Sequence, residues 1–184
     1  MHVAELLPTI PTNTAEALDL FDSSPAVDAE FMIGTWRGAE LPTGHPLDGF
    51  LEASGWWGKQ FVDAETVHPL LFPTRDGSAL WAMNPAIAFG GLGVAEKAPG
   101  VRSMSFATPI AATRLLSQTR RARARLRTTR YRGTDTATMV YDQLPINDVF
   151  HRLADDAVLG AMDLKGSAAP YFFVLRRDDS LRLL

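Results

Sequence analysis

The stretch RRARARLRTTRYRG at residues 120–133 carries an arginine at every second position over much of its length. Arg121, Arg123, Arg125 and Arg127 alternate with small or apolar residues, which is the period of a β-strand and not of a helix. Because neighbouring side chains of a strand point to opposite faces, this segment is predicted to have one solvent-exposed face and one buried face. Residues 136–144 follow after a glycine and fit an antiparallel partner strand.

Other parts of the chain favour the same kind of structure. Glycine and proline recur at short intervals between residues 34 and 58, which favours short strands and turns over long helices. Helical patterns are confined to residues 13–23, 25–33 and 145–154, the last because Pro145 precedes an apolar stripe at helical spacing. Residues 54–67 are predicted to form a strand pair or a strand and a turn, and 87–94 a strand or a turn. Further strands are predicted at 78–85, 157–164 and 170–178, while residues 98–119 give no clear pattern.

Roughly eight to ten short strands in one chain predict a mainly β fold, because such a sheet stabilises itself by closing into a barrel or pairing as a sandwich. A length of 184 residues suits one domain. We therefore predict an N-terminal arm with helices at 1–33 and a single β-barrel domain at 34–184. In this domain, residues 34–97 form the first part of the barrel and residues 98–184 complete it.

Composition excludes several function classes. The chain has no cysteine, so disulfides and thiolate chemistry are absent, and this fits a cytoplasmic protein. No apolar run is long enough to span a membrane, and the N-terminus lacks a basic signal region. Residues 97–134 hold ten Lys and Arg and no acid, yet the pI is about 5.8 and aromatic residues are sparse there. We therefore expect a solvated strand face and no nucleic-acid partner.

The pentapeptide GTWRG places Trp36 between Gly34 and Gly38. One interpretation is a stacking platform for a ligand, and the other is a structural plug for which the glycines clear space. The second is favoured. Trp56 and Trp57 also lie between glycines, and strand alternation allows only one of the two to face an interior.

Polar residues near these tryptophans are candidates for chemistry. His45, Asp48, Lys59 and His68 cluster around them in sequence, and Asp163 and Lys165 share one face of a predicted strand. Such groups can supply acid–base catalysis or bind a ligand carboxylate. Metal-ligand spacing, nucleophile motifs and phosphate or dinucleotide loops are missing, so we expect no metal and no cofactor.

Two blocks of the sequence resemble known families. GTWRG followed by HPLDGFLEASGWWGKQF resembles the GXWXG domain, and TATMVYDQLPINDVFHRLADDAVLGAMDLKG with PYFFVLRR resembles the domain of unknown function that follows it in bacterial proteins. This uncharacterised family implies no activity. A looser likeness to calycin or lipocalin barrels implies that Trp36 packs across a closed barrel end beneath Arg176 or Arg177.

We therefore predict a single antiparallel, calycin-like or lipocalin-like β-barrel with N-terminal helices and one helix near the C-terminal third. The predicted function is to bind a small hydrophobic or amphipathic ligand, such as a lipid, in the barrel cavity. The alternative is an enzyme that uses acid–base residues at the barrel mouth on a small hydrophobic substrate; enzyme activity is not favoured. A third alternative is an interaction protein whose arginine-rich strand face binds an acidic partner. A homodimer is also compatible with the sequence. The candidate ligand-binding residues are Trp56, Trp57, Phe61, Trp81, Met83, Phe89, Met139, Tyr141, Met162, Phe172, His45, Lys59, Asp163 and Lys165, and the candidate structural residues are Gly34, Trp36, Gly38 and Arg176.

Overall fold

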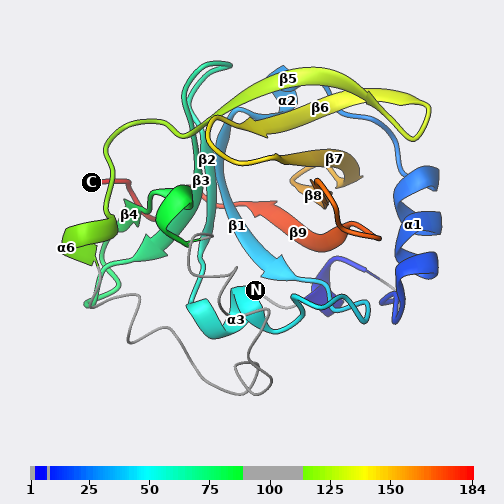
Figure 1. Cartoon of the computed structure of the whole chain (residues 1–184), viewed down its shortest axis with the longest axis horizontal. Coiled ribbons are helices and arrows are strands. Elements are labelled where there is room, and N and C mark those ends of the chain that lie inside the picture. Colours follow the sequence, from blue (N-terminus) through cyan, green and yellow to red (C-terminus); the bar gives the residue numbers. More distant parts are fainter. Residues whose placement is uncertain (1–2, 8, 89–113) are drawn as a thin grey trace.

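The computed structural model describes residues 3–7, 9–88 and 114–184, and this part of the chain is mainly β (Figure 1). Its strands are β1 (Gly34–Glu40), β2 (Gly58–Phe61), β3 (Val67–Pro73), β4 (Leu80–Ala82), β5 (Ala124–Tyr131), β6 (Thr134–Tyr141), β7 (Ile146–Ala154), β8 (Ala157–Leu164) and β9 (Tyr171–Arg177).

These nine strands form one antiparallel sheet that closes a ring. The strands from β5 to β9 pair consecutively, β9 pairs with β1, and β1 pairs with β2. The ring closes where β2 pairs with β3 and β3 pairs with β5 at Val67 and Ala124. β4 lies outside the closure, on the far half of β3. The predicted mainly β fold with a closing antiparallel sheet is confirmed.

Short helices surround the ring: η1 (Val3–Glu5), α1 (Thr14–Ser23), α2 (Ala29–Met32), α3 (Phe50–Ser54) and α6 (Arg114–Ser117). Asn13 caps α1 and Asp28 caps α2, because each side chain accepts a hydrogen bond from a backbone N–H one turn later. In Figure 1, α1 stands beside the ring and α3 lies below β1 and β2. Among the described residues, no helix is both long and apolar enough to cross a bilayer.

Alternation along the strands divides the apolar residues between two sides of the sheet. In β9, Tyr171, Phe173 and Leu175 belong to the large cluster that fills the ring. Their neighbours Phe172 and Val174 belong to a second cluster, which packs against α1 on the outside. Both faces of β9 are therefore buried, and its apolar residues run without interruption.

The helix predicted at residues 145–154 is wrong, because this segment is strand β7. Ile146 and Phe150 face the ring interior, whereas Val149 and Leu153 pack in the outer cluster beside α1. A strand buried on both sides carries apolar residues on both, and here they happened to fall at helical spacing. Pro145 precedes the strand and does not begin a helix.

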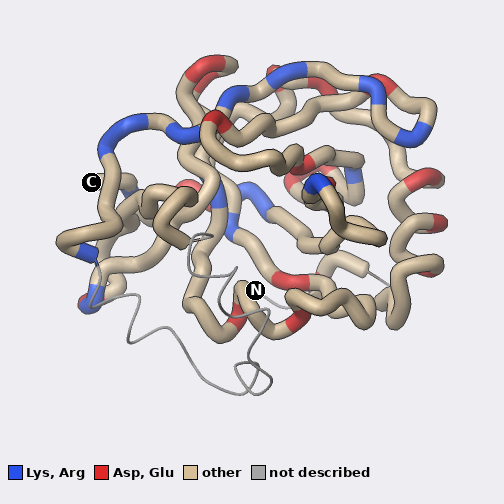
Figure 2. The backbone as a smooth tube through the Cα atoms, in the orientation of Figure 1, with Lys and Arg blue, Asp and Glu red and all other residues tan. Residues whose placement is uncertain are grey.

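The arginine-rich stretch is β5, and its alternation is real (Figure 2). Ala124 and Leu126 are buried, while Arg125 and Arg127 face outward. Acidic residues from neighbouring turns compensate them: Arg125 Nε lies 2.9 Å from Asp142, and Arg127 Nη2 lies 2.7 Å from Glu65. At the end of the hairpin, Arg132 pairs with Asp22 of α1, the helix whose acidic residues are marked in Figure 2.

Candidate ligand-binding site

A buried ion pair lies inside the ring. Lys59 of β2 places its Nζ 2.8 Å from Oδ2 of Asp148 on β7, and the two side chains are only 4% and 1% exposed. The same Nζ donates to the backbone oxygen of Pro69 at 3.3 Å. Both residues face inward because strand alternation places them on the face of Phe61 and Phe150, which form an interior aromatic contact.

Aromatic rings surround the ammonium group of Lys59. Its Nζ lies 5.4 Å from the centroid of a Trp56 ring, 5.8 Å from that of Tyr141 and 5.0 Å from that of Phe173. A cation over an aromatic face gains about 0.5–2 kcal/mol, more when water is excluded. These rings therefore offset part of the cost of burying the charge.

A cavity of about 30 Å³ adjoins the ion pair. This volume holds one or two water molecules or the polar end of a small ligand. The lining combines the ion pair with apolar and aromatic side chains, namely Leu47, Phe50, Leu51, Trp56, Lys59, Leu70, Tyr141, Asp148, Met162, Tyr171 and Phe173.

Three residues of this lining carry buried polar atoms that have no hydrogen-bond partner in the described structure. They are Oδ1 of Asp148, Nε1 of Trp56 and the hydroxyl of Tyr171, the last of which lies near the Glu40 carboxylate. A buried polar group without a partner costs about 1–3 kcal/mol, so native proteins satisfy nearly all of them. One acceptor and two donors therefore lie on residues that line one small cavity.

Burial also sets the protonation of these groups. It raises the pKa of the Asp148 carboxyl, while the Lys59 ammonium opposes this shift. Burial raises the pKa of both Tyr141 and Tyr171, so both phenols keep their protons at neutral pH. The site therefore combines one ion pair of zero net charge with neutral hydrogen-bonding groups.

The segment around α3 covers the cavity. Leu47, Phe50 and Leu51 lie partly buried over it and form its wall on that side. Glycines at both ends of α3, Gly49 and Gly55, adopt left-handed conformations with φ of 88° and 75°. The carboxylate of Glu40 on β1 holds the start of this helix by accepting from the backbone N–H groups of Gly49, Leu51 and Glu52.

Trp36 is fully buried inside the ring and does not line this cavity. Its Nε1 donates to the backbone oxygen of Met32 at 2.7 Å, and the Arg177 guanidinium lies 4.3 Å from its ring centroid. The late arginine over the indole is therefore Arg177. The assignment of Arg176 to that role is wrong, because Arg176 is exposed and pairs with Asp156.

The glycines of GTWRG have different uses. A Cβ at Gly38 would lie 2.1 Å from ring atoms of Trp56, so this glycine makes room for the cavity tryptophan. Gly34 has a φ of 135°, and a Cβ there would meet the guanidinium of Arg177 at 2.5 Å. The pentapeptide thus positions both Trp36 and Trp56, although they lie twenty residues apart in the sequence.

The structure brings together some of the predicted ligand-binding residues. Trp56, Lys59, Tyr141 and Met162 line the cavity. The residues Phe61, Trp81, Met83 and Met139 are buried in the same interior cluster without lining it, and Phe89 lies outside the described residues. His45 stands beside the site, with its ring 5.3 Å from that of Tyr171.

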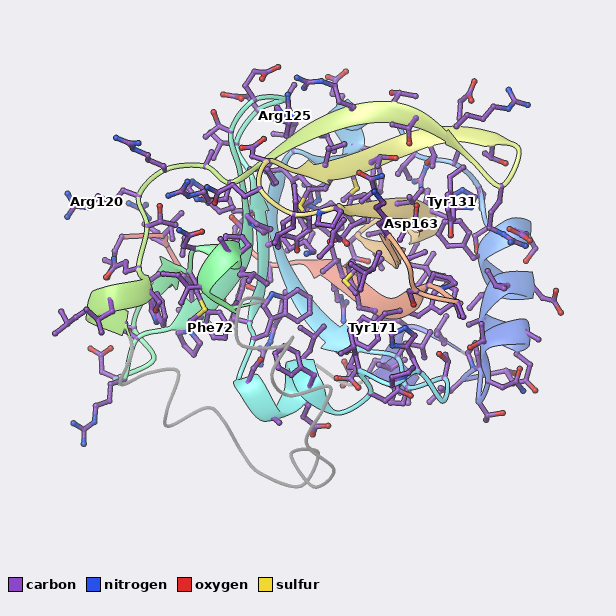
Figure 3. All side chains as sticks on the ribbon, in the orientation of Figure 1. Phe72, Arg120, Arg125, Tyr131, Asp163 and Tyr171 are labelled. Atoms are coloured by element: carbon purple, nitrogen blue, oxygen red, sulfur yellow. The ribbon has the colours of Figure 1, made fainter. Side chains whose placement is uncertain are left out.

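Other predicted residues lie elsewhere. The inward orientation expected for Phe172 is wrong, since it packs in the cluster on the outer side of the sheet, and Trp57 is the outward-facing member of the Trp56–Trp57 pair. Trp56 and Trp57 lie between α3 and β2, and only Trp56 reaches the cavity. Asp163 and Lys165 are exposed and do not line the cavity; Asp163 lies near Tyr131, as Figure 3 shows. Within residues 3–7, 9–88 and 114–184, no cluster of His, Asp and Glu could hold a metal ion.

Sequence reasoning missed the acidic partner of the site. Asp148 was assigned to a helix, where it falls off the apolar stripe and looks like a surface residue. If this segment is a strand, the side chains of Ile146, Asp148 and Phe150 lie on the same face. A carboxylate between two large apolar residues on one strand face indicates a buried charge. Tyr171 and Phe173, on the inward face of β9, were missed in favour of Phe172 between them.

The fold and the site define a class of protein: a closed antiparallel ring of strands around an ion pair and a small polar cavity. Residues 19–77 match the family model described as GXWXG protein, and residues 122–177 match the domain of unknown function DUF4334. The chain is also similar to a protein from Thermomonospora curvata of known crystal structure, with 33% identity over 91% of this chain and 89% of that one and a TM-score of 0.66. No curated protein matches the chain. The chain therefore belongs to the GXWXG family with the C-terminal domain of unknown function.

Proposed function

We propose that this protein binds a small, largely apolar molecule whose single polar group occupies the cavity beside Lys59 and Asp148. The observation that carries the proposal is the set of unpartnered buried atoms on Asp148, Trp56 and Tyr171 around one cavity. A ligand that hydrogen-bonds to them recovers free energy that the empty site lacks.

The cavity of about 30 Å³ takes only the polar end of such a ligand. The apolar end requires the space that Leu47, Phe50 and Leu51 now fill, so binding includes an outward movement of α3. The glycines at both ends of this short helix suit a hinge, because hinge residues absorb changes in φ and ψ.

An enzyme acting on a small hydrophobic substrate is the second candidate. Lys59, one of the predicted acid–base residues, lies at the cavity together with Tyr141 and Asp148. The other predicted groups do not join them: the Asp48 carboxylate accepts from backbone N–H groups of Thr43 and Gly44 in a turn.

Tryptophan fluorescence tests the binding proposal with primary alcohols from propanol to octanol as probes. We expect saturable quenching in the wild type and in Trp57→Phe, whose indole lies outside the ring. Trp56→Phe removes the reporting indole and the donor at the cavity, so the quenching should be lost or greatly weakened. Trp36→Phe should retain it while losing stability.

Absence of saturable quenching with every alcohol would overturn the proposal. So would quenching that survives Trp56→Phe and disappears with Trp57→Phe. Native mass spectrometry of freshly purified protein adds an independent measurement, since a bound ligand adds its mass to the folded protein.

A further inference from the structure

The buried cation of this protein is a lysine, although the chain strongly prefers arginine. It contains fifteen arginines and three lysines, Lys59, Lys97 and Lys165. Arginine is better suited to a purely structural buried ion pair, since its guanidinium binds a carboxylate through two parallel hydrogen bonds and is weakly hydrated. Lysine offers something arginine does not: a primary amine that becomes a nucleophile when it is desolvated and loses its proton.

We propose that Lys59 forms a protonated Schiff base with a small aldehyde or ketone bound in this cavity, an inference that rests on the proposed binding function. Lys59 forms part of the cavity wall, and its Nζ lies 2.8 Å from a carboxylate that can take its proton. The indole N–H of Trp56, which lacks a partner, is available to the carbonyl oxygen.

The reaction begins when the Lys59 ammonium gives one proton to the Asp148 carboxylate. The free amine attacks the carbonyl carbon, a C–N bond forms, and a proton moves from nitrogen to the former carbonyl oxygen to give a carbinolamine. The Asp148 carboxyl then protonates this hydroxyl, the C–O bond breaks, and the nitrogen lone pair completes the C=N bond. One water molecule leaves, and Asp148 is a carboxylate again.

The charges of the site select this substrate class. The carbonyl compound enters uncharged, and the protonated imine keeps the single positive charge opposite Asp148, so the buried pair stays balanced throughout. A carboxylate or an amine ligand would add a buried charge without a partner, which is costly in a site this deeply buried. The surrounding rings of Trp56, Tyr141 and Phe173 limit the access of water that would hydrolyse the imine.

The test is reductive trapping in the full-length protein with propanal and sodium cyanoborohydride, followed by peptide mapping. The wild type is its own control, because Lys165 is exposed and Lys59 is 3% exposed. If the amines react only by solvent access, Lys165 and the terminal amine gain the propyl group and Lys59 does not. The proposal expects the reverse order, with Lys59 alkylated first. In Asp148→Asn, alkylation of Lys59 should slow by about a hundredfold, the contribution of a positioned proton-transfer group.

Alkylation of Lys165 and the terminal amine with Lys59 unmodified would overturn the inference. Propanol, which has the same chain without the carbonyl, separates this outcome from failure of the binding proposal. If propanol quenches Trp56 while Lys59 is not trapped, the cavity binds ligands and only the Schiff base is refuted. If Asp148→Asn does not fold, the order in which Lys59 and Lys165 are alkylated in the wild type still tests the proposal.

Discussion

Removing one charge of the Lys59–Asp148 pair is expected to destabilise the protein far more than removing both. At 2.8 Å the attraction between the two charges is about 6 kcal/mol in an effective dielectric of about 20. Burying each ion costs several kcal/mol, so the pair as a whole contributes little net stability. Lys59→Met therefore leaves an unpaired buried carboxylate and should cost about 3–5 kcal/mol.

The double variant Lys59→Met/Asp148→Val removes both charges and keeps apolar side chains in their places. Valine suits a strand position, and a buried pair replaced by apolar residues of similar size is often neutral or stabilising. We expect its free energy of unfolding to lie within about 1–2 kcal/mol of the wild type. Urea denaturation at pH 7, monitored by circular dichroism, measures all three proteins.

A matched control is the surface pair Arg127–Glu65, whose charged atoms are 2.7 Å apart but whose side chains are 40% and 68% exposed. Arg127→Met should cost no more than about 1 kcal/mol, because solvent screens exposed pairs. The reasoning is refuted if Lys59→Met costs no more than Arg127→Met, or if the double variant is as unstable as Lys59→Met.

Two further predictions concern packing and pH. Gly38→Ala places a methyl group 2.1 Å from Trp56 ring atoms, so it should cost about 1–3 kcal/mol in urea denaturation and weaken alcohol quenching; unchanged stability would contradict the close approach. Burial lowers the pKa of His151, whose Nδ1 lies 2.6 Å from the backbone oxygen of Phe21 in α1. The unfolded state then binds the proton more readily, so stability should fall as the pH drops below about 6.5. His151→Gln should reduce this decline, to which the buried His45 and His68 also contribute, and an equal slope in both proteins would exclude His151 as a source.

Local patterns in the sequence were sufficient for much of the fold. The arginine alternation predicted β5, and the turn at Gly133 predicted its pairing with β6. The expected strand at 157–164 is β8, and the one at 170–178 contains β9. These strands can be predicted because their alternating pattern and the turn residues at their ends are formed by residues close together in the sequence. The segment at 145–154 failed for a related reason: a strand covered on both faces loses its alternation and mimics a helix.

The site was less accessible to this reasoning. Lys59, Trp56, Tyr141 and Met162 were named from residue type and strand placement, and they do line the cavity. Asp148 was missed because its face was misassigned, and Leu47, Phe50 and Leu51 because a cover from another element leaves no periodic signal in the sequence.

The sequence by itself determined that the chain is mainly β, that the arginine-rich stretch is a strand, and that one lysine stands among aromatic residues. Only the tertiary structure decided which strands join the two family segments into one ring, namely β1 with β9 and β3 with β5. It also decided that Lys59 meets Asp148, 89 residues later in the chain. The physical reason is that strand patterns arise from neighbouring residues, whereas a buried charge finds its partner only after the ring closes and excludes water.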